Sequence, residues 1–247
     1  MSKKIILVVI LVLIIAVGAF VISQMPTAKE KVYASLENLD SASYYWLYTL
    51  YNQQQGGETL KSIDIDYTID ENNNMAERHI NYVDTPDMKE ILKYNENSIT
   101  RYYGYYLEHE EYENTYYLDK WRKQEISKTS AEYEKYEFLN KDFYVEMLKN
   151  GKEYSRADGK YSVLVGKEYI QQMIDKLDLK EVKILTDVYV EVTVDNNNIS
   201  FLNIWLDSSN SNITEGHAVL SPGFDAECDG HEEKYLEAPE IFEEVEE

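Results

Sequence analysis

The residues of this chain with the strongest potential for metal chemistry are its histidines and one short acidic loop. The four histidines are His79, His109, His217 and His231. Their positions match no zinc-binding spacing such as H-E-x-x-H. Residues 225–230 place oxygen ligands at alternate positions before a glycine, as an EF-hand calcium loop does, but Leu236 stands where that loop needs a bidentate glutamate. We therefore expect no metal site.

Motifs for covalent catalysis and nucleotide binding are also missing from the sequence. It contains neither a G-x-S-x-G nucleophile elbow nor a Gly-rich phosphate loop. Its 46 acidic residues are so numerous that no single pair is marked out for acid–base work. The single cysteine, Cys228, excludes an intrachain disulfide. We expect a protein that is not an enzyme and that uses no cofactor.

Aromatic side chains give the best indication of a binding site. Two groups of rings follow one another: Tyr102, Tyr103, Tyr105 and Tyr106 around Gly104, and then Tyr112, Tyr116, Tyr117 and Trp121. Rings on one face of a curved sheet would offer apolar surface with polar tips. We expect Tyr103, Tyr105 and Trp121 to contact an apolar or amphiphilic ligand, with Phe143 and Met147 facing it from a helix. The alternative is that these rings fill a core or form cross-strand pairs.

Residue periodicity predicts the elements that would position these side chains. Apolar stripes at helical spacing predict helices at residues 27–40, 138–149 and 167–177. Alternation and aromatic content predict strands at residues 44–48, 63–70, 75–83, 88–94, 98–107, 112–121 and 217–220, and a hairpin of residues 188–194 and 199–206. Long antiparallel strands with a few helices over one face define an α+β fold.

Residues 5–23 form an uncharged apolar run that follows Lys3 and Lys4. At ~1.5 Å per residue the run spans the ~30 Å hydrocarbon core of a bilayer. Lysines before it, with no basic cluster after it, predict a cytoplasmic N-terminus and an extracellular domain. Because the run exceeds the usual signal-peptide core, we expect residues 1–24 to be a retained signal anchor in the cell membrane. Small residues at 17–19 leave cleavage, and hence secretion, as the alternative.

Charge bears on the possible partners of the exported domain, residues 25–247. The first 24 residues carry two lysines and no acid, so the remainder has 22 basic and 46 acidic residues, a net charge of −24. Such a surface repels nucleic acid and suits a cationic protein partner. No internal repeat or linker divides this domain. Its tail, residues 232–247, looks loosely structured, although residues 241–242 have the apolar character to dock onto the body.

The order of elements resembles the lipoprotein-carrier (LolA-like) superfamily of exported proteins. It consists of an amphipathic helix, two aromatic strands around a Gly turn, a meander ending in the run YYLDKWRK at residues 116–123, and then helices and a Val-rich hairpin. The resemblance covers residues 27–247. It implies an unclosed antiparallel half-barrel curled around helices, which in several members holds acyl chains. This chain departs from many members in having no cysteine after the signal for lipid attachment.

Two functions follow as hypotheses. The first is a membrane-anchored extracytoplasmic binding protein that holds a lipid or another apolar or amphiphilic ligand in a half-barrel cavity, without covalent chemistry. The second is a cell-surface protein-interaction or sensor domain with no small ligand, whose acidic face recognises a basic partner.

Overall fold

The computed structural model describes residues 26–39, 44–55, 58–70, 73–82, 85–108, 116–157, 159–177, 179, 181–224 and 237–245. The predicted anchor at residues 1–24 and the acidic loop at residues 225–230 lie outside these ranges. Within them, no helix combines the length and the apolar character needed to cross a bilayer.

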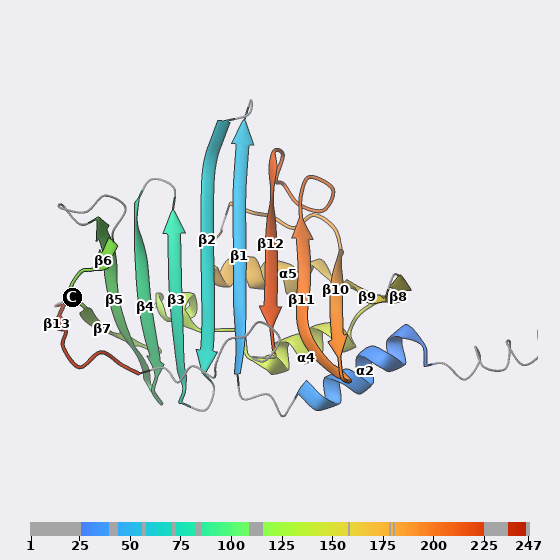
Figure 1. Ribbon diagram of the computed structural model, residues 1–247, viewed down its shortest axis with the longest axis horizontal. Coiled ribbons are helices and arrows are strands. Elements are labelled where there is room, and N and C mark those ends of the chain that lie inside the picture. Colours follow the sequence, from blue (N-terminus) through green and yellow to red (C-terminus); the bar gives the residue numbers. More distant parts are fainter. Residues whose placement is uncertain are drawn as a thin grey trace, which may run out of the picture.

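One large sheet dominates the described chain (Figure 1). In chain order its strands are β1 (Tyr44–Gln55), β2 (Glu58–Asp70), β3 (Met75–Tyr82), β4 (Thr85–Tyr94), β5 (Ser98–Glu108), β6 (Tyr116–Leu118), β7 (Arg122–Ser127), β8 (Glu153–Ala157), β9 (Lys160–Val165), β10 (Val188–Asp195), β11 (Asn198–Leu206), β12 (Gly216–Gly223) and β13 (Glu243–Glu244). The spatial order is β13-β7-β5-β4-β3-β2-β1-β12-β11-β10-β9-β8, and β6 pairs with β5 beside this path.

The sheet is curved and, over the described strands, does not close. Its path ends at β8 on one side and at β13 on the other. Neighbouring strands are antiparallel except at one place, where β13 runs parallel to β7. The sequence-based expectation of an α+β fold with an unclosed antiparallel sheet is therefore confirmed, whereas the predicted transmembrane helix lies outside the described residues.

The helices cover one face of the sheet. They are α2 (Ala28–Leu39), α3 (Tyr133–Tyr136), α4 (Lys141–Lys149) and α5 (Lys167–Lys176), and Figure 1 shows α3, α4 and α5 behind the sheet. The predicted apolar stripe of α2, formed by Val32, Leu36 and Leu39, is buried against the strands. We call this side of the sheet the helix-facing side and the other side the outer face.

The hairpin of β10 and β11 shows why the Val-rich segment forms strands. In β10 the residues Val188, Val190 and Val192 are buried against the helices, and the residues between them are more exposed. This alternation matches the two-residue period of a half-buried strand. Asn196 and Asn197 have φ angles of 48° and 67°, as a two-residue primed hairpin turn requires. The predicted hairpin is confirmed.

Between residues 112 and 165 the prediction differs from the structure. Residues 112–121 were expected to form one strand, but the described part has β6 at Tyr116–Leu118, a break at residues 119–121 and then β7 at Arg122–Ser127. Strands β7 and β8 have few apolar residues and so show no apolar alternation. Strand β9 does alternate, with Tyr161, Val163 and Val165 buried, but the sequence analysis did not predict it. The second predicted helix also starts later, at Lys141, because the Asn140 side chain accepts a hydrogen bond from the Phe143 N–H and caps α4.

Candidate ligand-binding site

Two of the five predicted ligand contacts, Tyr103 and Tyr105, lie on β5 and face the helix side of the sheet. In the register with β4, Tyr103 is opposite Glu90 and Tyr105 is opposite Met88. The two rings meet edge to face with their centroids 6.3 Å apart. Tyr105 remains 36% exposed, so this end of the helix-facing side is open to solvent.

Trp121 packs on the outer face instead. It contacts a small cluster of Met75, Ile91 and Tyr102, which it covers together with Phe242 from the C-terminal segment. Tyr102 and its neighbour Tyr103 must point to opposite sides, because successive residues of a strand alternate between faces. Trp121 is therefore separated by the sheet from the two predicted tyrosines.

The helix residues Phe143 and Met147 lie in a third place. Met147 is fully buried in the main core, and Phe143 packs on the edge of that core with its ring 5.8 Å from the Tyr169 ring. Helix α4 packs against β9 and α2, at the far end of the sheet from β5. The five predicted residues thus lie in three separate environments, and their role in binding stays a prediction.

A buried charge cluster that the sequence analysis missed lies on the helix-facing side of β3, β4 and β5. The Glu90 carboxylate is fully buried between two guanidinium groups, those of Arg78 and Arg101. The Arg101 Nε donates to Glu90 Oε1 at 2.7 Å and its Nη1 donates to Gln124 Oε1 at 3.2 Å. Three charges at this depth are tolerable only because they satisfy one another's hydrogen bonds.

Aromatic rings cover this charge cluster. The Arg101 guanidinium lies 4.1 Å from the centroid of the Tyr103 ring and 5.2 Å from that of Tyr136 in α3. The Arg78 guanidinium lies 5.5 Å from the same Tyr136 ring. Burial raises the pKa of the Tyr136 hydroxyl, so the ring stays neutral over the arginines. This arrangement fits cation–π contacts and excludes water from the ion pairs.

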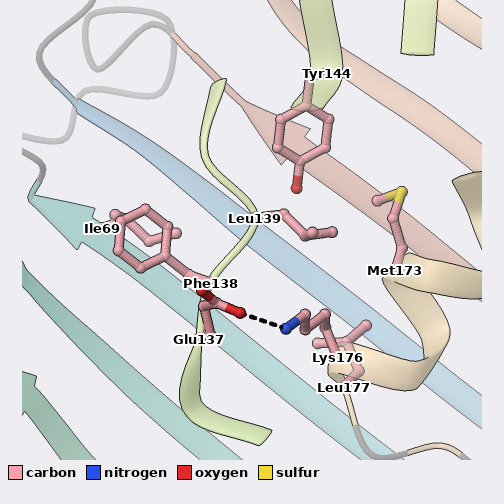
Figure 2. Close-up of a pocket in the computed structure, with 8 residues that line it drawn as sticks. All are labelled: Ile69, Glu137, Phe138, Leu139, Tyr144, Met173, Lys176 and Leu177. Atoms are coloured by element: carbon pink, nitrogen blue, oxygen red, sulfur yellow. Dashed lines mark hydrogen bonds and ion pairs between the residues drawn. The ribbon is translucent and has the colours of Figure 1, made fainter. Parts of the chain in front are cut away.

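A small apolar pocket opens beside α3, between β2, α4 and α5. It is lined by Ile69, Glu137, Phe138, Leu139, Tyr144, Met173, Lys176 and Leu177. Figure 2 shows the Tyr144 hydroxyl directed into the space beside Leu139. Burial raises the pKa of that hydroxyl, so the pocket holds no ionised phenol at neutral pH. The cavity volume is about 20 Å³, room for about one water molecule.

The pocket is closed by residues 133–139, which comprise α3 and the connection to α4; we call this segment the cover. The Tyr94 hydroxyl donates to the Tyr136 carbonyl at 2.7 Å, and the Tyr94 ring meets the Phe138 ring with centroids 4.9 Å apart. At the mouth, Lys176 Nζ lies 3.1 Å from Glu137 Oε2, as Figure 2 shows. Helix α3 itself has no buried residue.

The described residues contain no group of three or more His, Cys, Asp or Glu side chains that could hold a metal ion. The predicted absence of a cofactor and of catalysis stays a prediction, because the structure does not test it.

Comparisons with known proteins show a likeness to solved structures but not to protein families or curated sequences. No family model matches the sequence, and no curated protein matches it. Among solved structures, the chain is similar to the crystal structure of the Mycobacterium tuberculosis lipoprotein LppX, with 11% identity and a TM-score of 0.38. The match covers 79% of this chain and 93% of that one. The resemblance is weak and lies at the level of the fold, and membership of the lipoprotein-carrier superfamily stays a prediction.

Proposed function

We propose that the protein is a membrane-anchored extracytoplasmic binding protein that holds the apolar chain of a lipid or another amphiphile beneath the cover. The observation that carries this proposal is the pocket between the sheet and α5, whose lining is almost entirely apolar. It is bounded on one side by a short irregular segment rather than by a packed helix. Binding would rest on burial of apolar surface, at ~25 cal/mol per Å², and would need no covalent step.

The ligand has to displace the cover, because the closed cavity is far smaller than a drug-sized site of roughly 300–1,000 Å³. The movement would break the ion pair of Lys176 with Glu137, the cation–π contacts of Tyr136 and two hydrogen bonds. In these hydrogen bonds, Lys176 Nζ donates to the Glu134 carbonyl at 3.1 Å and the Tyr94 hydroxyl donates to the Tyr136 carbonyl at 2.7 Å. Helix α3 has no fully buried residue, but Tyr133 and Tyr136 pack on the edge of the core. Lifting the cover would therefore expose parts of these rings together with Phe138 and Leu139, and the ligand would cover part of this apolar surface again.

The polar rim favours an amphiphile with an anionic head group. Lys176 stands at the mouth, where Glu137 now supplies its counter-charge. The cover also carries Tyr136, which lies over the two arginines of the buried charge cluster. A carboxylate or phosphate head group would take the place of Glu137 on Lys176 as the apolar chain displaces Leu139. Residues 5–23, acting as an anchor, would keep the domain beside its lipid supply.

A displacement assay with matched ligands and variants tests the proposal. Residues 25–247, which contain the whole described core, would be titrated with a fluorescent fatty acid and then with lauric acid or lauryl alcohol. We expect Leu139→Trp, which fills the pocket, to abolish binding of both ligands. Ile241→Trp is the matched control, since Ile241 is 86% exposed, and we expect it to bind normally.

Lys176→Glu tests the role of the head group separately. It should weaken the binding of lauric acid about tenfold, through the loss of one charged contact of ~1.4 kcal/mol, and leave the binding of lauryl alcohol unchanged. Binding that survives Leu139→Trp unaltered would place the ligand elsewhere and refute the proposal. Circular dichroism of each variant would establish that it is folded.

A further inference from the structure

The C-terminal segment adds a short strand to an edge of the sheet. Strand β13 pairs in parallel with the start of β7, with Glu243 opposite Arg122 and Glu244 opposite Lys123. Its backbone donates twice, from the Glu243 N–H to the Trp121 carbonyl at 2.8 Å and from the Val245 N–H to the Lys123 carbonyl at 3.0 Å. This is the geometry by which a peptide extends an exposed sheet edge.

Side chains add a charge match to this backbone pairing. Lys120 Nζ lies 2.6 Å from Glu243 Oε2, and Lys123 Nζ lies 3.1 Å from Glu244 Oε1. The contact with Glu244 raises the pKa of the Lys123 ammonium group. Residues 120–123 read KWRK in a chain of net charge −22, and the last eleven residues contain six glutamates. The edge is therefore a basic site in an acidic protein, and the segment on it is acidic.

One aromatic ring anchors the segment. The Phe242 ring lies 5.4 Å from the Tyr102 ring and 5.1 Å from Lys123 Nζ, measured from ring centroids. Together with Trp121 it covers the small apolar cluster on the outer face of the sheet. The neighbouring Ile241 is 86% exposed and adds no burial. The recognised pattern is thus an aromatic residue followed by two acids in an extended chain.

The segment occupies only part of the edge that it binds. In the described residues β13 pairs with two of the six residues of β7, so positions 124–127 continue past it. Both ion pairs lie at the surface, with the Glu243 and Glu244 side chains 58% and 66% exposed, and surface pairs contribute little. A longer segment with the same pattern would make more backbone bonds along β7 than the chain's own tail makes.

We propose that the edge of β7, with Lys120, Trp121 and Lys123, is a binding site for an extended acidic segment of another protein that carries an aromatic anchor. The C-terminal segment is its built-in occupant and blocks the site until such a partner displaces it. The site lies on the outer face and edge of the sheet, away from the pocket under the cover, and does not depend on ligand binding there.

A fluorescent synthetic peptide of residues 237–247 serves as the probe, with the full chain in non-ionic detergent. The tail variant Phe242→Ala/Glu243→Lys/Glu244→Lys removes the aromatic anchor of the C-terminal segment. It also replaces both of its ion pairs by repulsion from Lys120 and Lys123. We expect the peptide to bind this variant at least tenfold more tightly than it binds the wild-type chain, because a tethered competitor acts at roughly millimolar effective concentration. Adding Lys120→Glu/Lys123→Glu to the tail variant should abolish binding.

Two controls separate recognition of the pattern from a general charge effect. Glu237→Lys/Glu240→Lys changes two acids of the same tail outside β13 and should leave the site blocked. A peptide with the same composition in scrambled order should not bind the tail variant. Equal binding of both peptides, no gain in the tail variant, or self-association of that variant without peptide binding would each overturn the proposal.

Discussion

The two halves of the sheet bury different chemistry on the same helix-facing side. From β8 to β2 the strands are covered by α2, α4 and α5, and the buried residues are predominantly apolar, as Leu202, Ile204 and Met147 illustrate. From β3 to β7 the apolar rows are interrupted by the buried charge cluster beneath α3. Both halves share one apolar core, to which the second half contributes Leu92, Ile99 and Ile126. The difference is that the second half also depends on a few directional contacts between buried charges beneath the cover.

Removing the carboxylate of the charge cluster should have the largest effect. Glu90→Gln removes the carboxylate that lies between the buried guanidinium groups of Arg78 and Arg101, so we expect the free energy of unfolding to fall by about 3–5 kcal/mol. Urea denaturation measures this loss. Glu77→Gln is the control, because Glu77 pairs with Lys89 on the partly exposed outer face and should cost about 1 kcal/mol or less. Equal losses in the two variants would erase the distinction between the halves.

Shortening a core side chain in the packed half should have a smaller effect. Met147 is fully buried among apolar neighbours, so Met147→Ala should reduce the free energy of unfolding by about 3 kcal/mol through lost burial and a new cavity. The exposed Ile241→Ala should change it little. Because Met147 is not among the residues that line the pocket, this variant should bind an amphiphile with unchanged affinity. If the affinity fell together with the stability, packing in the core and binding under the cover would not be separate.

A pH effect of smaller size is expected at the start of α5. Asp187 accepts hydrogen bonds from Lys152 Nζ at 2.6 Å and from the Lys167 N–H at 3.2 Å, and these contacts lower the pKa of its carboxyl. A carboxyl with a lowered pKa stabilises the fold fully at pH values above the ordinary Asp pKa of about 3.9. This stabilisation is lost as the pH falls through the lowered pKa. Asp187→Asn should therefore melt earlier than wild type at pH 7, and the difference should shrink in acid. A difference that stays constant with pH would refute this assignment.

Sequence periodicity predicted most strands of both halves, except for β7, β8, β9 and β13, but it did not predict the buried charge cluster. The alternation of Val188, Val190 and Val192 and the stripe of α2 predict their burial directly, because each pattern repeats within one element. Arg78, Glu90 and Arg101 belong to three strands and meet only through cross-strand register, which no local pattern encodes. From their residue types alone, these three residues would also be expected at the surface, because charged side chains are seldom buried.

The candidate site was missed for the same reason. Leu139 and Phe138 were expected inside a helix, but Asn140 caps α4 and leaves them in the cover beside the pocket. The docking of Phe242 was anticipated from its apolar character and is confirmed, whereas the predicted contact of Ile241 is wrong, because that side chain is 86% exposed. The N-cap position was the one local signal that could have separated the cover from α4.

The most direct test of the central claim is native mass spectrometry of the domain, residues 25–247. The domain would be exported by a host cell with membranes and purified without detergent. The account predicts one lipid or fatty acid bound per chain, identified after organic extraction, and its absence from Leu139→Trp prepared in the same way. A wild-type protein that is empty, and that stays empty after incubation with anionic lipid vesicles, would contradict the account and favour the interaction-domain alternative.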